Sequence, residues 1–99
     1  MTHIVMIREP RPFYSYNDEK NFFRWLEEIP AVGKVTGTSK GLKIVVKTPV
    51  ADKDLREIIA VMSRYSLDLH PLHALLTTEN SDWFKNPEAF WHDAVFRQA

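Results

Sequence analysis

The stretch DLHPLH places Asp68, His70 and His73 close together, and all three residue types are common metal ligands. Two histidines three residues apart share one helical face only if the helix continues past Pro71, and a proline disfavours helix at the residue before it. No glutamate completes a His-Glu-x-x-His pattern. We interpret these histidines as surface residues beside a turn, and we keep a metal-dependent enzyme that uses these three residues as the third hypothesis.

Other reactive side chains are not arranged for catalysis. The chain has no cysteine, and its serines lie in no glycine-flanked nucleophile elbow. The adjacent carboxylates at 18–19 and 27–28 would lie about 100° apart around a helix, so neither pair is positioned to share a proton. The three glycines are spaced along a predicted hairpin rather than before a helix, which excludes a P-loop. The sequence predicts no catalytic residue, no metal, no cofactor and therefore no enzyme.

A basic ribbon of four lysines occupies the middle of the sequence, in a stretch that contains neither acidic nor aromatic residues. Nucleic-acid-binding sheets usually add aromatic residues for base stacking, and a net charge of zero argues against binding by counterion release, so a nucleic-acid partner is not expected. Two interpretations stay open, namely protection of exposed strands against aggregation and contact with an acidic protein. The ribbon consists of Lys34, Lys40, Lys43 and Lys47.

Acidic and aromatic residues alternate near the C-terminus. Protein-docking surfaces often carry large aromatic anchors inside a charged rim, so this acidic–aromatic end is the predicted binding surface. The same aromatics could instead close the open end of the core, because one Trp or Phe side chain buries about 150–250 Å². The sequence leaves open whether they are core or interface. The predicted binding residues are Glu79, Asp82, Trp83, Glu88, His92, Asp93 and Phe96.

The elements that must position these residues begin with a strand over His3–Ile7. Its apolar residues fall at both alternating positions, which predicts a strand covered on both faces or in the middle of the sheet. The prolines at positions 10 and 12 predict irregular backbone. Residues 32–48 then predict two strands joined by a turn in which Gly41 supplies a positive φ.

Two amphipathic helices separate and follow these strands. The first is predicted over Asp18–Glu28 with Asn17 or Asp18 as its cap, and the stronger one over Lys53–Ser66 with Asp52 as its cap. Apolar residues recur in both at the i, i+3, i+4 spacing that places one face on a core.

Short helical segments are predicted for the remainder of the chain. Asp68 can cap a turn of helix, and Ser81 can cap a short helix that ends at Phe84. Asn86 is the expected cap of a last helix that begins at Pro87, since proline is favoured in the first helical position.

The element order is β-α-β-β-α followed by short C-terminal helices, which predicts an α+β two-layer sandwich with a small three-stranded sheet. The first two strands allow a right-handed crossover, and the last two form an antiparallel hairpin. No linker or repeat interrupts the pattern, so we predict a single α+β domain over residues 1–99.

Composition limits the class of protein. The 99 residues are 44% hydrophobic, enough for a core, and the absence of cysteine excludes disulfides. We see no signal-peptide pattern and no apolar run of about 18–20 residues, so we expect a cytoplasmic protein with no membrane contact. Residues 1–50 carry a net charge of +3 and residues 51–99 of −3. Such polarity suits docking on a polarised partner or on a second copy.

The stretch LREIIAVMSRYSLDLHPLHAL, followed by WF and FWHDAVF, resembles small proteobacterial proteins similar to the immunity proteins of contact-dependent inhibition and other polymorphic toxin systems. The resemblance covers about residues 20 to 96 and implies a cognate toxin domain as partner. It implies no catalytic residue, and the step from His70 to Pro71 departs from its pattern. The residues that carry it are Phe22, Trp25, Leu26, Leu55, Arg56, Tyr65, Leu72, Trp83, Phe84, Trp91 and Phe96.

The preferred hypothesis is therefore a non-enzymatic protein-binding module, in its sharper form an immunity-type inhibitor that occludes the active site of a toxin. The second hypothesis is a structural or assembly module that forms a homodimer through its polarised surface. A metal-dependent enzyme is the third.

Overall fold

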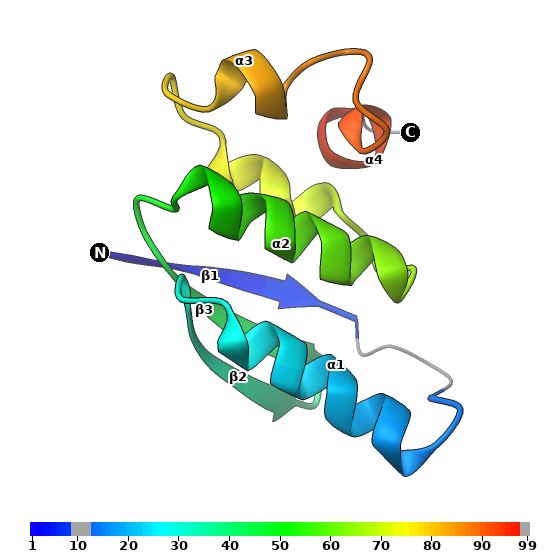
Figure 1. The fold of residues 1–99 in the computed structure, drawn as a ribbon. Coiled ribbons are helices and arrows are strands. Elements are labelled where there is room, and N and C mark those ends of the chain that lie inside the picture. The colour runs from blue at the N-terminus through cyan, green and yellow to red at the C-terminus, as the bar shows by residue number, and fades with distance from the viewer. Residues whose placement is uncertain (9–12, 98–99) are drawn as a thin grey trace.

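The structure is a computed structural model that describes residues 1–8 and 13–97 (Figure 1). Residues 9–12, which contain the prolines of the predicted irregular segment, and residues 98–99 lie outside the described part. The elements in chain order are β1 (Thr2–Ile7), α1 (Tyr16–Glu28), β2 (Val32–Thr38), β3 (Gly41–Lys47), α2 (Asp52–Arg64), the 3₁₀ helix η1 (His70–Leu75), α3 (Ser81–Phe84) and α4 (His92–Phe96).

The sheet has the strand order β1-β3-β2, and both neighbouring pairs are antiparallel. The first and second strands therefore run in the same direction, joined by α1, with β3 inserted between them. This arrangement confirms the predicted α+β class, the three-stranded sheet and the hairpin of the last two strands. None of the described helices, which reach 13 residues at most, is long and apolar enough to cross a membrane.

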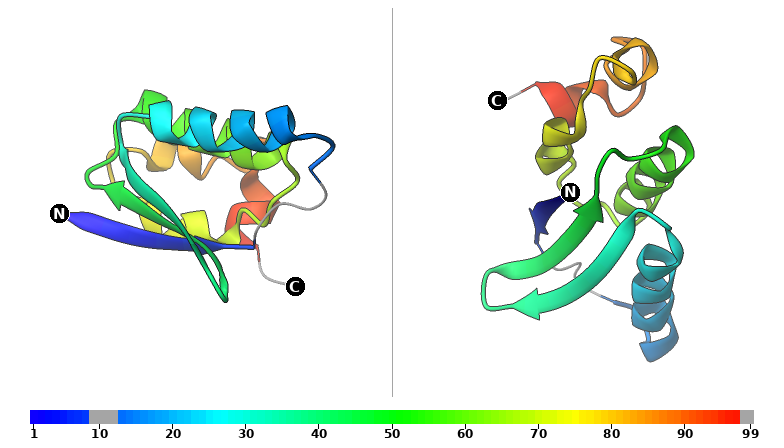
Figure 2. Two further views of the ribbon diagram at one scale, coloured as in Figure 1. Left: turned by 90° about the horizontal axis from the view of Figure 1, so that it is seen from below. Right: turned by 90° about the vertical axis from the view of Figure 1, so that its left-hand side faces the viewer.

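Both long helices lie on one side of the sheet, as Figure 2 shows, so the molecule has a helical layer over a single sheet face. The predicted apolar stripes face this sheet: Phe22 and Leu26 from α1 and Leu55 and Met62 from α2 have no solvent exposure. They meet the inward side chains of the strands, and together these residues form one core cluster. The single domain over residues 1–99 stays a prediction, with which this one core agrees.

The first strand is not covered on both faces, and this prediction from the sequence is wrong. β1 is an edge strand, and only its inward residues Val5 and Ile7 are buried. Ile4 is 48% exposed and Met6 is 40% exposed on the opposite face, because no helix packs there. In this strand, apolar residues at both the inward and the outward positions therefore indicate an exposed apolar strip rather than a central strand.

Helix α1 begins two residues earlier than predicted, and its cap is Ser15 rather than Asn17 or Asp18. The Ser15 Oγ accepts a hydrogen bond from the Asp18 backbone N–H at 3.1 Å, while Asp18 Oδ2 accepts one from the Tyr14 N–H at 3.0 Å. This reciprocal bonding fixes the chain where it enters the helix. Asp18 thus helps to start the helix without being its cap, because its carboxylate accepts a hydrogen bond from Tyr14, the residue before the cap.

Asp18 also ties the two long helices together. The Tyr65 hydroxyl donates to Asp18 Oδ1 at 3.1 Å, and the Trp25 Nε1–H donates to Glu57 Oε1 at 2.9 Å. Partial burial raises the pKa of the Tyr65 phenol above its usual value, and the hydrogen bond to the Asp18 carboxylate and its charge raise it further. The neutral phenol is therefore the form that the folded state favours.

Helix α2 begins at Asp52, so this residue is not its cap. Ala51 takes the cap position without a side-chain hydrogen bond. The acidic side chain of Asp52 instead lies in the first turn, where it complements the helix dipole. The helix ends at Arg64, two residues before the predicted end, because Ser66 adopts a left-handed φ of 58° and the Leu67 N–H returns to the Met62 carbonyl at 2.8 Å.

Two cap predictions near the C-terminus are also wrong. Asn80, rather than Ser81, precedes α3, and its buried side chain accepts from Thr77 and donates to the Leu75 carbonyl. The Asn86 side chain accepts from the Glu88 N–H at 2.9 Å, so it closes a turn rather than starting a helix. Helix α4 consequently begins only at residue 92.

The hairpin turn confirms the expected role of Gly41, whose φ is +126°. Thr38 closes the turn: its hydroxyl donates to the Gly41 carbonyl at 2.7 Å and accepts from the Lys40 N–H at 3.2 Å. A Cβ at Gly41 would also collide with the Ile7 carbonyl oxygen on the neighbouring strand. The turn thus needs glycine both for its backbone conformation and for the close approach of β1.

Replacing this glycine should destabilise the fold. We expect Gly41→Ala to lower the free energy of unfolding by about 2–3 kcal/mol, because alanine is strained at that φ and its methyl group displaces β1. Gly37→Ala is the matched control on the same hairpin, since nothing lies within 4 Å of a Cβ there. Its effect should stay within about 0.5 kcal/mol in urea unfolding. Equal losses for the two variants would contradict this account of the turn.

Candidate protein-interaction surfaces

The acidic–aromatic end comprises α3, the turns that follow it, and α4. Phe84 of α3 is fully buried, and Phe96 of α4 packs on it with ring centroids 5.0 Å apart. Trp83 and Trp91 meet edge to face at 6.0 Å, and the Trp91 Nε1–H donates to the Phe84 carbonyl at 2.7 Å. The structure therefore confirms the interpretation that these aromatics close the end of the core, and Trp83 and Phe96 are only partly available to a partner.

The four acidic residues among the predicted binding residues are all exposed, but basic residues lie among them. The Arg56 guanidinium stacks 4.0 Å above the Trp83 ring centroid, and the Lys85 ammonium lies 5.7 Å from that of Phe96. This end of the molecule is therefore of mixed charge rather than purely acidic. The acidic residues are Glu79 before α3, Asp82 in α3, Glu88 in the following turn and Asp93 in α4.

His92 and Asp93, both predicted binding residues, contact each other on α4. A ring nitrogen of His92 lies 3.0 Å from Asp93 Oδ1, and Arg97 Nη1 lies 3.3 Å from Oδ2. The hydrogen bond with His92 lowers the pKa of the Asp93 carboxyl below its usual value, and Arg97 adds to this effect. At neutral pH the Asp93 carboxyl is therefore ionised, and the nearby Arg97 partly balances its negative charge.

The sequence did not single out Phe90, although it is the most exposed aromatic of this end. Its side chain is 74% exposed, and its ring contacts Trp91 edge to face at 5.0 Å. The expected helix from Pro87 would have turned Phe90 toward the core. Because the helix starts later, the residue lies in a turn and its ring meets solvent.

The three residues of the metal hypothesis do not form a ligand set. Asp68 does not cap η1 as predicted, because Leu69 takes the cap position; its Oδ1 instead accepts from the His70 backbone N–H at 3.0 Å and closes the turn before the helix. The rings of His70 and His73 stack at 4.5 Å, and their Nδ1 atoms face the carbonyl oxygens of Val95 and His70. Within the described residues, no three His, Asp or Glu side chains gather so that they could hold a metal ion.

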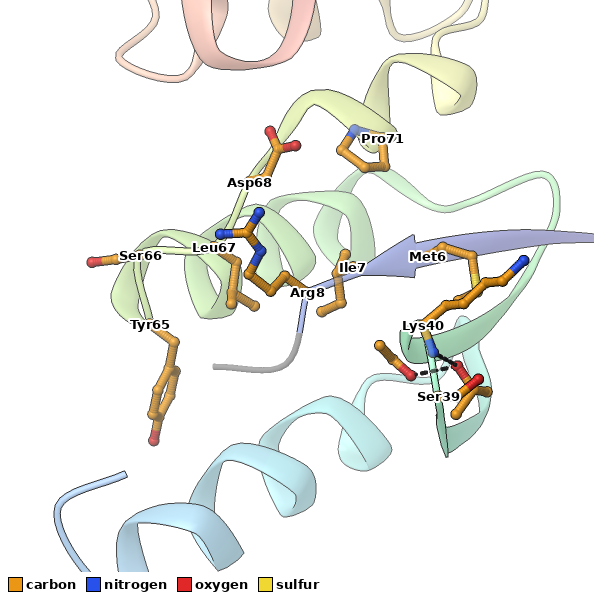
Figure 3. A pocket seen from close by; sticks show the side chains of 12 residues that line it. Met6, Ile7, Arg8, Ser39, Lys40, Tyr65, Ser66, Leu67, Asp68 and Pro71 are labelled. Atoms are coloured by element: carbon orange, nitrogen blue, oxygen red, sulfur yellow. Dashed lines mark hydrogen bonds between the residues drawn. The ribbon is translucent and has the colours of Figure 1, made fainter. Parts of the chain in front are cut away.

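A wide cleft of about 1150 Å³ opens between the end of β1, the hairpin tip and the segment after α2 (Figure 3). Arg8, Lys40 and Asp68 line it, together with Ser39 and Ser66. Residues 9–12, which follow Arg8 in the sequence, lie outside the described part, so we assign no ligand to this cleft.

The sheet presents its uncovered side to solvent, and we call this surface the open sheet face. The register pairs Ile4 with Val45 and Met6 with Lys43, so Ile4 and Val45 are direct neighbours and Met6 lies diagonally across from Val45. On the other side of β3, Lys34 pairs with Val45. The outward side chains that define this face are Ile4, Met6, Lys34, Lys43, Val45 and Lys47.

Comparison with known proteins gives no match: no protein family, no curated protein and no solved structure is significantly similar to this chain. The resemblance to immunity-type proteins therefore stays a prediction, as do the partner and the predicted binding residues.

Replacing either of two phenylalanines of the C-terminal end by alanine should change the stability of the fold to different extents. We expect Phe96→Ala to lower the free energy of unfolding by about 2 kcal/mol, because its ring packs on buried Phe84. Phe90→Ala is the matched control and should cost less than about 0.5 kcal/mol, since that ring lies largely in solvent. Urea unfolding followed by tryptophan fluorescence measures both. A larger loss for Phe90→Ala than for Phe96→Ala would contradict the assignment of Phe96 to the core.

Proposed function

We propose that this chain is a non-enzymatic protein-binding module that acts by covering a surface of another protein. The observation that carries the proposal is the open sheet face. There Ile4 and Met6 are 48% and 40% exposed, although each is an apolar residue on a regular strand. Val45 lies beside them, so the apolar side chains form one strip instead of scattered single residues. Contiguous apolar surface with a polar rim is typical of protein-interaction sites.

The sheet makes this strip a suitable docking platform. β1 and β3 pair over the full length of β1, and the inward residues of both strands are anchored in the core. The strand backbone that carries the outward side chains is therefore fixed, and binding requires little ordering of the backbone. A preorganised surface binds with a smaller entropic cost.

The sharper form of the proposal is an immunity-type inhibitor that occludes the active site of a toxin. It rests on the resemblance carried by residues such as Leu55, Trp83 and Trp91, and occlusion needs no reactive side chain on the inhibitor. The acidic–aromatic end stays a predicted second contact. We place the open sheet face first because its apolar side chains are not used by the core, whereas Trp83 and Phe96 are.

Isolation of a tagged chain from its native host tests the function. We expect a complex that contains one stoichiometric partner and elutes well above the 11.6 kDa of the chain, with the activity of the partner suppressed in the complex. A chain that elutes alone, and whose addition suppresses no activity in the products of the neighbouring genes, would contradict the proposal.

A pair of matched variants links the function to the surface. Ile4→Ser should weaken the complex by about tenfold or more, because it removes an apolar contact near the centre of the strip. Tyr14→Ser removes an exposed apolar residue outside the strip and should leave affinity unchanged. Equal affinity for both variants would show that the open sheet face is not the contact surface.

A further inference from the structure

The open sheet face carries charge of only one sign. Lys34, Lys43 and Lys47 project from it, and the sequences of β1, β2 and β3 contain no Asp or Glu at all. A partner surface is favoured when its potential is complementary to such a face, since complementary charges steer association and like charges oppose it. The apolar strip therefore lies within a rim that selects for negative charge.

The lysines also lie close to the strip. The Lys47 side chain crosses over β2: its Cε lies 3.6 Å from the position that a Cβ on Gly33 would occupy, and Val45 Cγ1 lies 3.7 Å from the same point. The stem of Lys47 thus extends the apolar surface beside Val45, while its ammonium group remains available to a partner.

We propose that the open sheet face is the docking site for an acidic protein surface with an apolar centre, whose carboxylates pair with Lys34, Lys43 and Lys47 around Ile4, Met6 and Val45. This inference rests on the proposed function and adds to it the chemistry of the partner.

We favour a different protein over a second copy of the chain as the occupant. Two open sheet faces packed on each other would bring at least six lysines together, because each face contributes three. Docking of the C-terminal half of one copy, with its net charge of −3, on the face of another would leave one free face and one free end. Such a head-to-tail contact forms a closed ring or an open chain, depending on its rotation, and the titration below reports either as self-association.

Nucleic acid is not the favoured occupant either. None of the three strands contains an aromatic residue on which a base could stack. The exposed aromatics Tyr14, Tyr16 and Phe90 all lie outside the strands. An apolar strip of Ile4, Met6 and Val45 offers nothing to a phosphate backbone, whereas it complements apolar side chains of a protein.

Titration of the ¹⁵N-labelled chain with three probes, followed by amide chemical shifts, tests the proposal. The probes are a peptide of Glu-Glu-Leu repeats, a Lys-Lys-Leu peptide of equal length, and a thymidine oligonucleotide. We expect only the Glu-Glu-Leu peptide to shift the amides of β1 and β3 appreciably, with an effect that weakens as salt is added. The concentration dependence of the spectrum without probe reports self-association.

Three results would overturn the proposal. The first is a response of the strand amides to the oligonucleotide as strong as to the acidic peptide. The second is a shift of the same amides with protein concentration alone, which would identify a second copy as the occupant. The third is an acidic peptide that perturbs only residues outside the sheet, or none.

Charge-reversed variants separate the face from the net charge of the chain. The double variant Lys43→Glu, Lys47→Glu should bind the acidic peptide about tenfold more weakly than the unaltered chain at low salt. The matched control Lys20→Glu, Lys53→Glu changes the net charge equally, but on exposed positions of α1 and α2, and should lose less than about twofold. Equal losses would contradict a specific site.

The same double variants distinguish this inference from the proposed function. If the native complex is sensitive to Ile4→Ser but keeps its affinity in the Lys43→Glu, Lys47→Glu variant, the partner is not acidic and only this inference fails. If no native complex forms, the proposed function fails, and the peptide titration still reports whether the face selects acidic surfaces.

Discussion

The rest of this structure depends on one constraint, which is that a three-stranded sheet is covered by helices on one face only. The chain supplies two long helices, α1 and α2, and both pack on the same side, where the inward residues of the strands meet them. The core therefore has a closed side and an open side. No second helical layer exists among the described residues. An apolar side chain on the outward side of a strand is therefore exposed to water unless a partner covers it.

The other features of the fold complete this one-sided core. Tyr65 and Asp18 join the ends of the two helices, and the aromatic residues of α3 and α4 close the core beyond β1. These aromatics account for most of the large apolar residues near the C-terminus, which look like a docking surface in the sequence. Their packing leaves Phe90 as the most exposed aromatic ring of that region. The positive strands and the acidic C-terminal half then give the molecule its charge polarity.

Much of the fold could be predicted because its determinants are local. Periodic apolar residues identify both long helices, and Gly41 marks the hairpin turn, since few other residues tolerate its φ. The cap of α1 was assigned to the wrong residue although a local signal exists: Ser15 and Asp18 have the spacing of a capping box, in which the serine is the cap and the acidic residue lies three positions later. The position of β1 in the sheet depends on which faces the distant helices cover, so its two-sided apolar pattern was interpreted as burial. That same pattern was the signal of the interaction surface.

The central claim is that the outward apolar side chains of the strands are exposed in the free chain, and oxidation of its methionines tests this most directly. Met6 lies on the open sheet face at 40% exposure, Met62 lies in the core at 0%, and Met1 is fully exposed. Treatment of the dilute chain with hydrogen peroxide, followed by mass spectrometry of its peptides, should show Met6 oxidised at a rate close to that of Met1 while Met62 stays protected. Protection of Met6 to the level of Met62 would contradict the account, because it would mean that the face is already covered.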